Sequence, residues 1–271
     1  VRGSIDTTKN VIDIVEGIKI TANENELNIR GTDLEIEIST TVPATIREEG
    51  EVVIPSSEIY KLVKELPNED IKIYDKDGKV KIETDNSKFT LSSYNPDEYP
   101  EPMKVEEDTH FKIEPETLKD IIKKLNFSCA TDDTQPHLNG ILLDIDEDNI
   151  IAVSTNTYRL SHYKLENTYD VESSQVILPL SSTKQIKKLI KDTEEEIDIV
   201  FSDDKNAMFI FDNEVLKTRI IEGQFPDYTQ VMPRAYNSEV EVSTKSLKSL
   251  LKRVRIIANE SSGVINIDVD K

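Results

Sequence analysis

The sequence predicts an α+β fold made of tandem copies of one domain, because it contains an internal repeat, alternating strand patterns and a few short amphipathic helices. The stretch 17–36, GIKITANENELNIRGTDLEI, aligns without gaps with the stretch that begins at Gly140. Two further aligned pairs begin at Ile54 and Leu178, and at Phe111 and Val240. A repeat of about 125 residues is far longer than a solenoid unit, so each copy is expected to form a domain with its own core.

The alignments divide the chain into domains at residues 1–109, 110–239 and 240–271. We expect a complete middle copy, a first copy that lacks the segment carrying its opening helix, and a third copy that stops after its first elements. The chain does not begin with Met, which agrees with a missing N-terminal piece.

Alternating polar and apolar residues predict antiparallel hairpins, such as 71–85, whose two runs meet at Asp77-Gly78. Apolar residues at helical spacing predict amphipathic helices over 57–66, 116–126, 182–191 and 244–257. Two short helices among many strands in a complete copy are typical of the α+β class.

The charge distribution gives the first indication of function. The chain has 33 basic and 53 acidic residues and a formal net charge of −20, which at first argues against a nucleic-acid partner. The four helical segments reverse this balance, with 14 Lys or Arg against four Asp or Glu, and every cation is predicted to point away from the apolar stripe. One position is cationic in all four segments: Lys64, Lys123, Lys191 and Lys252.

This segregation predicts a surface that binds the phosphate backbone of duplex DNA without reading its bases. The plainer interpretation, lysines on the solvated face of an ordinary amphipathic helix, is less favourable for four concordant helices in an acidic chain. Two other functions stay open: a scaffold whose basic helices bind an acidic protein, and an enzyme with a carboxylate pair in an interdomain cleft. The candidate DNA-binding residues on the helices are Lys61, Lys64, Lys119, Lys123, Lys124, Lys184, Lys187, Lys188, Lys191, Lys248, Lys252 and Arg253.

The sequence carries no signal for catalysis, a metal or a cofactor. It has no G-x-x-x-x-G-K, G-x-S-x-G or H-E-x-x-H motif. The acidic run 144–149 lacks the Gly and Glu of a calcium loop, so we expect a solvated hairpin turn there. The single cysteine, Cys129, excludes an internal disulfide and is expected to be a buried small hydrophobic residue in a reducing cytoplasm. No apolar run reaches the ~18 residues of a membrane span.

Five stretches carry a resemblance to a known family. They are LNIRGTDLEIEI (27–38), SKFTLSSYNPDEYPE (87–101), PHLNGILLDI (136–145), STNTYRL (154–160) and RIIEGQFPDYTQVMP (219–233). In the same order they resemble a first-domain strand pair and the RFxL…FP, LNG, ATDGHRL and LIEGxFPDYxxVIP segments of the bacterial DNA polymerase III beta subunits, the sliding clamps. Together these stretches span nearly the whole chain, which makes the resemblance highly specific.

The resemblance implies a homodimeric ring of head-to-tail subunits, three domains each, whose helices face duplex DNA in the central hole. Such a ring tethers the replicative polymerase, has no catalysis of its own and lies in the cytoplasm at the nucleoid, away from membranes. The resemblance also implies a pocket for short linear peptides from the polymerase, the clamp loader and repair proteins. By matching motifs, the pocket residues are Leu138, Thr155, Thr157, Tyr158, Arg159, Leu160, Pro226, Gln230 and Val231, and further DNA-contacting positions are Lys9, Asp132, Gln135 and His137.

Some positions depart from the family pattern. Thr157-Tyr158 stands where the family usually has Gly-His, and Gln230 stands where a basic residue is common, so we expect a narrower pocket or a different peptide preference. The stretch 10–17 lacks the family's TLPILEG. A third domain that stops at residue 271 lacks one face of the head-to-tail interface, so this chain by itself is not expected to close a ring.

Overall fold

The computed structural model describes residues 13–106, 109–132, 134–166, 173–202, 204–233, 235, 239–257 and 265–268. Contacts divide the chain into two units, Val1–Phe225 and Pro226–Lys271, and each is described by itself. The first unit contains all the named strands, and the second contains one helix and one 3-10 turn.

The strand pairing of the first copy recurs in the second. The neighbours β4-β1-β2-β3 of the first copy correspond to β12-β9-β10-β11 of the second, and β5-β6-β7 correspond to β13-β14-β15. The recurring strand order confirms the internal repeat. All pairings are antiparallel, which confirms the α+β class. The strands of the first copy are β1 (Gly17–Asn23), β2 (Glu26–Thr32), β3 (Ile36–Pro43), β4 (Gly50–Pro55), β5 (Lys72–Lys76), β6 (Lys79–Glu83) and β7 (Lys88–Ser92). Those of the second copy are β8 (Thr109–Ile113), β9 (Gly140–Ile145), β10 (Asn149–Thr155), β11 (Leu160–Glu166), β12 (Ser174–Pro179), β13 (Ile197–Ser202), β14 (Asn206–Ile210) and β15 (Glu214–Arg219).

The four α-helices lie close to their predicted positions: α1 (Ser56–Glu65), α2 (Pro115–Leu125), α3 (Leu180–Leu189) and α4 (Thr244–Ile257). Pro115 is the first residue of α2, where its fixed φ suits a helix start. The predicted helix 182–191 ends at Leu189 and continues as the 3-10 turn η6 (Ile190–Asp192), so Lys191 lies in that turn. The other 3-10 turns are η2 (Asp13–Glu16), η3 (Pro96–Glu98), η4 (Asn126–Ser128), η5 (Pro136–Leu138) and η7 (Tyr228–Gln230). In the described part of the chain, no helix has the length and apolar character needed to cross a bilayer.

Two tight turns follow their predicted chemistry. Asp77 and Gly78, between β5 and β6, have φ of 57° and 69°, the left-handed values that a two-residue hairpin turn of this sequence favours. Asp146, between β9 and β10, accepts hydrogen bonds from the backbone N–H groups of Asp148 and Asn149 at 2.8 and 2.6 Å. The acidic run is therefore a hairpin turn closed by its own aspartate.

The two copies share one sheet. β3 of the first copy pairs with β15 of the second, which joins eight strands in the order β4-β1-β2-β3-β15-β14-β13-β8. The core of the second copy contains the apolar stripe of α2 and also Ile36 and Ile38 from β3. The first copy has a smaller core around Ile54, Val80 and Ile82. The copies therefore do not have fully separate cores, because the shared sheet carries two side chains of one into the other.

A buried ion pair between Arg30 and Glu37 stabilises the junction between the two copies. Glu37 on β3 accepts a hydrogen bond from Arg30 Nη1 at 2.9 Å and from the backbone N–H of Met103 at 3.2 Å. Arg30 Nη2 donates to the carbonyl oxygen of Pro100 at 2.7 Å, and Lys217 Nζ on β15 donates to that of Met103 at 2.7 Å. Lys217 Nζ also lies 3.6 Å from Glu37 Oε1, so this one carboxylate contacts a strand of each copy and the segment that joins them.

Candidate functional site

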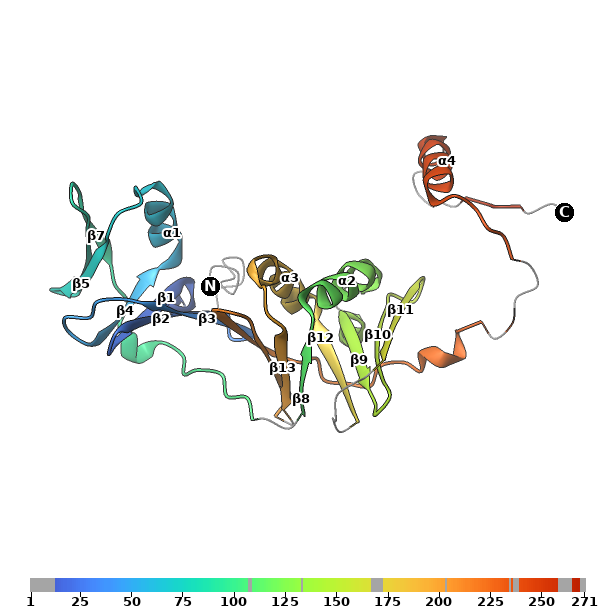
Figure 1. Ribbon diagram of the computed structural model, residues 1–271, viewed down its shortest axis with the longest axis horizontal. Coiled ribbons are helices and arrows are strands. Elements are labelled where there is room, and N and C mark those ends of the chain that lie inside the picture. The colour runs from blue at the N-terminus through green and yellow to red at the C-terminus, as the bar shows by residue number, and fades with distance from the viewer. Residues whose placement is uncertain are drawn as a thin grey trace. The chain divides into compact units, whose positions relative to one another are not determined.

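The basic faces of α2 and α3 lie next to each other in the first unit. The two helices pack against each other on the strands of the second copy (Figure 1). Their apolar residues, such as Ile122 and Ile186, are buried in the core below. The lysines on these helices and on η6 are exposed or half-exposed, as helical spacing predicts: Lys119, Lys123, Lys124, Lys184, Lys187, Lys188 and Lys191.

Some of these lysines are paired with acids on their own helix. Lys119 Nζ lies 2.6 Å from Glu116, and Lys124 Nζ lies 2.6 Å from Asp120. The hydrogen bond that Lys124 donates to the Asp120 carboxylate raises the pKa of Lys124. The other five form no salt bridge with any described residue: Lys123, Lys184, Lys187, Lys188 and Lys191. Lys188 Nζ donates a hydrogen bond to Gln185 at 2.9 Å. The uncompensated charges of these five lysines are what a phosphate-binding surface requires.

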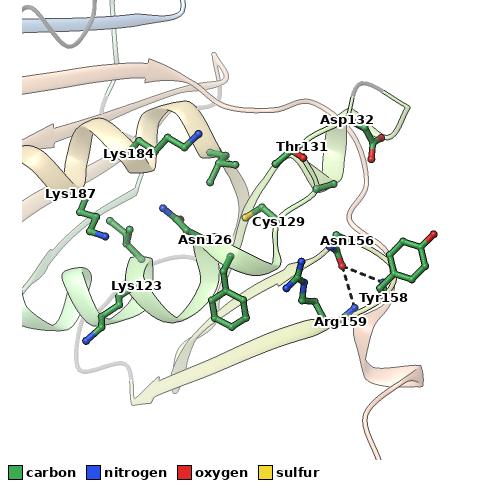
Figure 2. A pocket seen from close by; sticks show the side chains of 14 residues that line it. Lys123, Asn126, Cys129, Thr131, Asp132, Asn156, Tyr158, Arg159, Lys184 and Lys187 are labelled. Carbon is green, nitrogen blue, oxygen red and sulfur yellow. Dashed lines mark hydrogen bonds between the residues drawn. The ribbon is translucent and has the colours of Figure 1, made fainter. Parts of the chain in front are cut away.

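A groove with a volume of about 550 Å³ opens beside these lysines. It lies among the end of α2, the start of α3, the loop 130–132 and the turn 156–159 (Figure 2). Four cations line it, namely Lys123, Lys184, Lys187 and Arg159, together with one acid, Asp132. The excess of positive charge in a concave site favours an anionic ligand.

The helix pattern and the family motifs give no indication of this groove or of its lining residues Asn126, Phe127 and Asn156. Phe127 is 60% exposed, and the guanidinium of Arg159 lies 6.0 Å from the centre of its ring, within cation–π range. The Oδ1 atom of Asn126 is buried without a hydrogen-bond partner among the described residues. These two residues and Asn156 come together only when the end of α2 packs beside the β10–β11 turn. The one sequence signal is the aromatic residue that follows an amphipathic helix.

The turn between β10 and β11 holds four of the predicted pocket residues in a defined geometry. Thr155 Oγ1 donates to the carbonyl oxygen of Arg159 at 2.8 Å and accepts from Thr157 N–H at 3.1 Å. Asn156 Oδ1 accepts from the backbone N–H groups of Tyr158 and Arg159 at 3.3 and 3.2 Å (Figure 2). Thr157 has a φ of 73°, a left-handed conformation that costs a residue with a Cβ on the order of 1–2 kcal/mol. The hydrogen bonds hold this strained turn, which projects Tyr158 into solvent with 94% exposure.

The other predicted pocket residues have different surroundings. Leu138, in η5, is buried, and its carbonyl oxygen accepts a hydrogen bond from Ala130 N–H at 2.9 Å. Leu160 begins β11 and is half-buried. Pro226, Gln230 and Val231 are exposed residues of the second unit, where Gln230 Nε2 donates to Asp227 at 2.9 Å. The predicted pocket residues are therefore divided between the two units, and those of each unit are described by themselves.

The remaining predicted DNA contacts are distributed over both units. Lys61 and Lys64 are exposed on α1, Gln135 is exposed and His137 is half-buried, all in the first unit. The second unit carries three exposed cations on α4, namely Lys248, Lys252 and Arg253. Lys9 lies outside the described residues.

Comparison with known families decides the identity. The sequence model of the DNA polymerase III beta subunit, N-terminal domain, matches residues 1–105, and that of the central domain matches residues 112–227. The chain belongs to the DNA polymerase III beta subunit family. The beta sliding clamp of Staphylococcus aureus strain Mu50 is 31% identical over 261 residues, which cover 93% of this chain and 69% of that protein.

Solved sliding clamps have the same fold. The Bacillus subtilis clamp superposes with a TM-score of 0.91 at 26% identity, covering 96% of this chain and 70% of that one. The Pseudomonas aeruginosa DnaN clamp bound to griselimycin superposes with a TM-score of 0.89 at 25% identity, covering 97% and 72%.

As a beta subunit, the chain is a processivity clamp of DNA replication, and a scaffold for an acidic protein is not favoured. Sliding clamps are accessory subunits of the polymerase rather than catalysts.

In the part of the chain that the structure describes, no group of His, Cys, Asp and Glu side chains is arranged to hold a metal ion. Burial raises the pKa of the Cys129 thiol to about 11, so at neutral pH this cysteine of the clamp is a protonated, unreactive group.

Proposed function

We propose that this clamp encircles duplex DNA as a ring of two head-to-tail subunits and thereby holds the replicative polymerase on its template. The observation that carries the proposal is the group Lys123, Lys184, Lys187 and Lys191, exposed on adjacent elements of a chain with a net charge of −20. Contacts between lysines and phosphates are independent of sequence, so they centre the duplex and let it slide. The acidic residues elsewhere repel DNA from the other surfaces.

The pairing between the copies supports the head-to-tail ring. β15, the last strand of the second copy, pairs with β3, the third strand of the first. Within the described sheets, β11, the third strand of the second copy, pairs only with β10, and β7, the last strand of the first, pairs only with β6. The same rule would join β11 to the last strand of a third copy and β7 to a partner subunit, which would continue the head-to-tail pairing from one subunit to the next.

Encirclement predicts that retention depends on the topology of the DNA. The complete product of the gene, loaded by its clamp loader onto a nicked circular plasmid, is expected to stay bound through gel filtration in high salt. Cutting the plasmid once should release it, because a ring slides off a free end. Equal retention on circular and linear DNA would contradict the ring, since ordinary phosphate binding does not depend on ends.

We further propose that the β10–β11 turn, with Pro226, Gln230 and Val231, binds short peptides of the polymerase, the clamp loader and repair proteins in the bacterial cytoplasm. Tyr158 supports this role because a rigid turn presents its ring to solvent, and such aromatic side chains dominate binding energies at interfaces. The griselimycin complex of the Pseudomonas aeruginosa clamp supports a ligand site on this fold.

The peptide pocket is tested with griselimycin as the probe. In calorimetric titrations of the complete gene product, Tyr158→Ala is expected to weaken binding roughly 30-fold, the effect of removing an aromatic anchor worth about 2 kcal/mol. Tyr60→Ala, at another exposed tyrosine, is the matched control and should leave binding unchanged. Retention of the Tyr158→Ala clamp on circular DNA should be normal. Equal affinities of Tyr158→Ala and wild type would place the pocket elsewhere.

A further inference from the structure

The groove beside α2 and α3 contains groups that phosphate binding does not use. All of its lining residues lie between Ile122 and Lys187, within the second copy. Its volume of about 550 Å³ falls within the range of about 300–1,000 Å³ that is usual for small-molecule sites. The phosphates of a duplex contact the exposed ends of lysines, whereas the groove also has an aromatic ring, an amide and a carboxylate. These groups indicate a smaller ligand with more than one kind of chemical group.

The charges of the groove are separated along its length. Lys123, Lys184 and Lys187 lie at one end, and Asp132 lies at the other (Figure 2). Hydrogen bonds from the Thr134 hydroxyl and backbone N–H hold the pKa of Asp132 below its usual value, so its carboxylate is ionised at neutral pH. A phosphate group is attracted to the lysine end and repelled from the other, whereas the carboxylate accepts N–H groups. The groove is therefore complementary to a ligand with phosphates at one end and N–H donors at the other.

Phe127 provides a surface on which a planar ring can stack. It is 60% exposed, although the Arg159 guanidinium lies 6.0 Å from its ring centre. Nucleic-acid bases stack on aromatic rings, and guanidinium groups add cation–π attraction. In a duplex the bases are stacked and paired inside the double helix, so a duplex has no base face to offer Phe127. The stacking partner is therefore an unpaired base.

The side chain of Asn126 lacks a partner in the wall of the groove. Its Oδ1 atom is buried without a hydrogen bond to any described residue. Figure 2 shows the Asn126 amide directed toward the space between Lys184 and Lys187. Nearly all buried polar atoms in folded proteins are paired, so an unpaired amide at a groove indicates a group that the ligand supplies. An amide can donate to a phosphate oxygen or accept from an N–H group, and a nucleotide carries both.

We propose that this groove binds a free nucleoside triphosphate. Its phosphates lie among Lys123, Lys184 and Lys187, and its base stacks on Phe127 beside Arg159. A triphosphate concentrates several negative charges at one end of the molecule, which matches three neighbouring lysines. A DNA strand, by contrast, carries one charge per nucleotide.

A nucleotide in the groove covers lysines that the duplex also requires, so the two ligands are expected to compete. This consequence rests on the proposed function, because it assumes that these lysines contact DNA. The nucleotide site itself does not depend on that assumption and is present in the chain without DNA.

Calorimetric titration of the complete gene product with ATP, in the presence of EDTA and without DNA, tests the site. The wild type is expected to bind ATP at least about tenfold more tightly than adenosine or inorganic triphosphate, because each of these lacks one set of contacts. Phe127→Ala should weaken ATP binding roughly tenfold, the effect of losing one stacked base, and leave the binding of inorganic triphosphate unchanged. Unchanged triphosphate binding also shows that the variant is folded. Tyr60→Ala, at an exposed ring on α1, is the matched control and should have no effect.

Two further measurements separate this site from the DNA surface. Lys184→Gln should weaken the binding of ATP and of inorganic triphosphate by the same factor, because it removes a phosphate contact only. Lys79→Gln, at an exposed lysine on β6, should change neither. Phe127→Ala should keep the duplex affinity of the wild type. A clamp that binds ATP but no duplex would contradict the proposed function and support the nucleotide site.

Four results overturn the proposal. A wild type that does not bind ATP has no nucleotide site. Equal affinities for ATP and inorganic triphosphate, with no effect of Phe127→Ala, show a general anion site only. A short single-stranded oligonucleotide that binds through Phe127, while ATP does not bind, assigns the groove to an unpaired strand of DNA. Loss of duplex affinity in Phe127→Ala makes this ring part of the DNA surface.

Discussion

Replacing Glu37 with alanine is expected to lower the free energy of unfolding by about 3–5 kcal/mol, because the substitution leaves a buried guanidinium without its partner. Glu37 is 3% exposed, and Arg30, which is 2.9 Å from it, is also buried. The alanine variant would further leave the backbone N–H of Met103 without its acceptor. A urea titration followed by circular dichroism measures the loss.

Two further variants distinguish a buried charge from an ordinary ion pair. Glu51→Ala breaks the salt bridge between Lys19 and Glu51, 2.7 Å long with Glu51 41% exposed, and should cost at most about 1 kcal/mol. The double replacement Arg30→Met and Glu37→Leu should cost less than Glu37→Ala alone, because it removes both charges together. If Glu37→Ala and Glu51→Ala lower the free energy of unfolding equally, Glu37 does not stabilise the junction between the copies more than an exposed ion pair does.

The buried side chain of Tyr99 lies at the same junction, beside Arg30. The ring lies 5.0 Å from the Arg30 guanidinium, and its hydroxyl donates to the carbonyl oxygen of Gly17 at 3.2 Å. Burial raises the pKa of this hydroxyl to about 12, so it remains a donor throughout the neutral range. The junction between the copies is therefore held by fixed polar contacts.

The internal repeat made most of the fold predictable, because a strand or helix predicted in one copy is also expected at the aligned residues of the other copy. Apolar spacing alone located all four helices, and the buried Ile and Leu side chains of α1, α2 and α3 lie on the predicted apolar stripe. The buried pair Arg30 and Glu37 could not be found in this way. In the strand pattern of 27–38 both residues read as solvent-facing, and only the later segment around Pro100 and Met103 covers them.

The candidate site shows the same limit. The exposed lysines followed from helical spacing, and Tyr158 followed from the family motif. The groove did not, because Asn126, Phe127 and Asn156 belong to irregular segments that tertiary packing brings together. Strain at Thr157 was also invisible, since nothing in the sequence fixes a positive φ on a residue with a branched Cβ.

Reversing three charges, Lys123→Glu, Lys184→Glu and Lys187→Glu, is expected to weaken the affinity of the complete gene product for duplex DNA on the order of a hundredfold at ~0.1 M salt. These lysines lie on adjacent helices around one groove and form no salt bridge with any described residue, so each is available to a phosphate. Each lost phosphate contact should also reduce the slope of log K against log salt by about 0.9. Fluorescence anisotropy with a labelled duplex over a series of salt concentrations measures both quantities.

The matched control reverses Lys76, Lys79 and Lys164 instead, which are exposed lysines on strands and give the same change in net charge. If only the total charge matters, both triple variants will lose affinity equally, and the basic helix face has no special role. If the face formed by α2 and α3 meets the duplex, only the helix variant will lose affinity and salt dependence. Griselimycin binding should be unchanged in both variants, because the Tyr158 side chain is not altered. Loss of DNA and griselimycin binding together in the helix variant would instead indicate one site for both ligands, at the groove where Lys123 and Tyr158 meet.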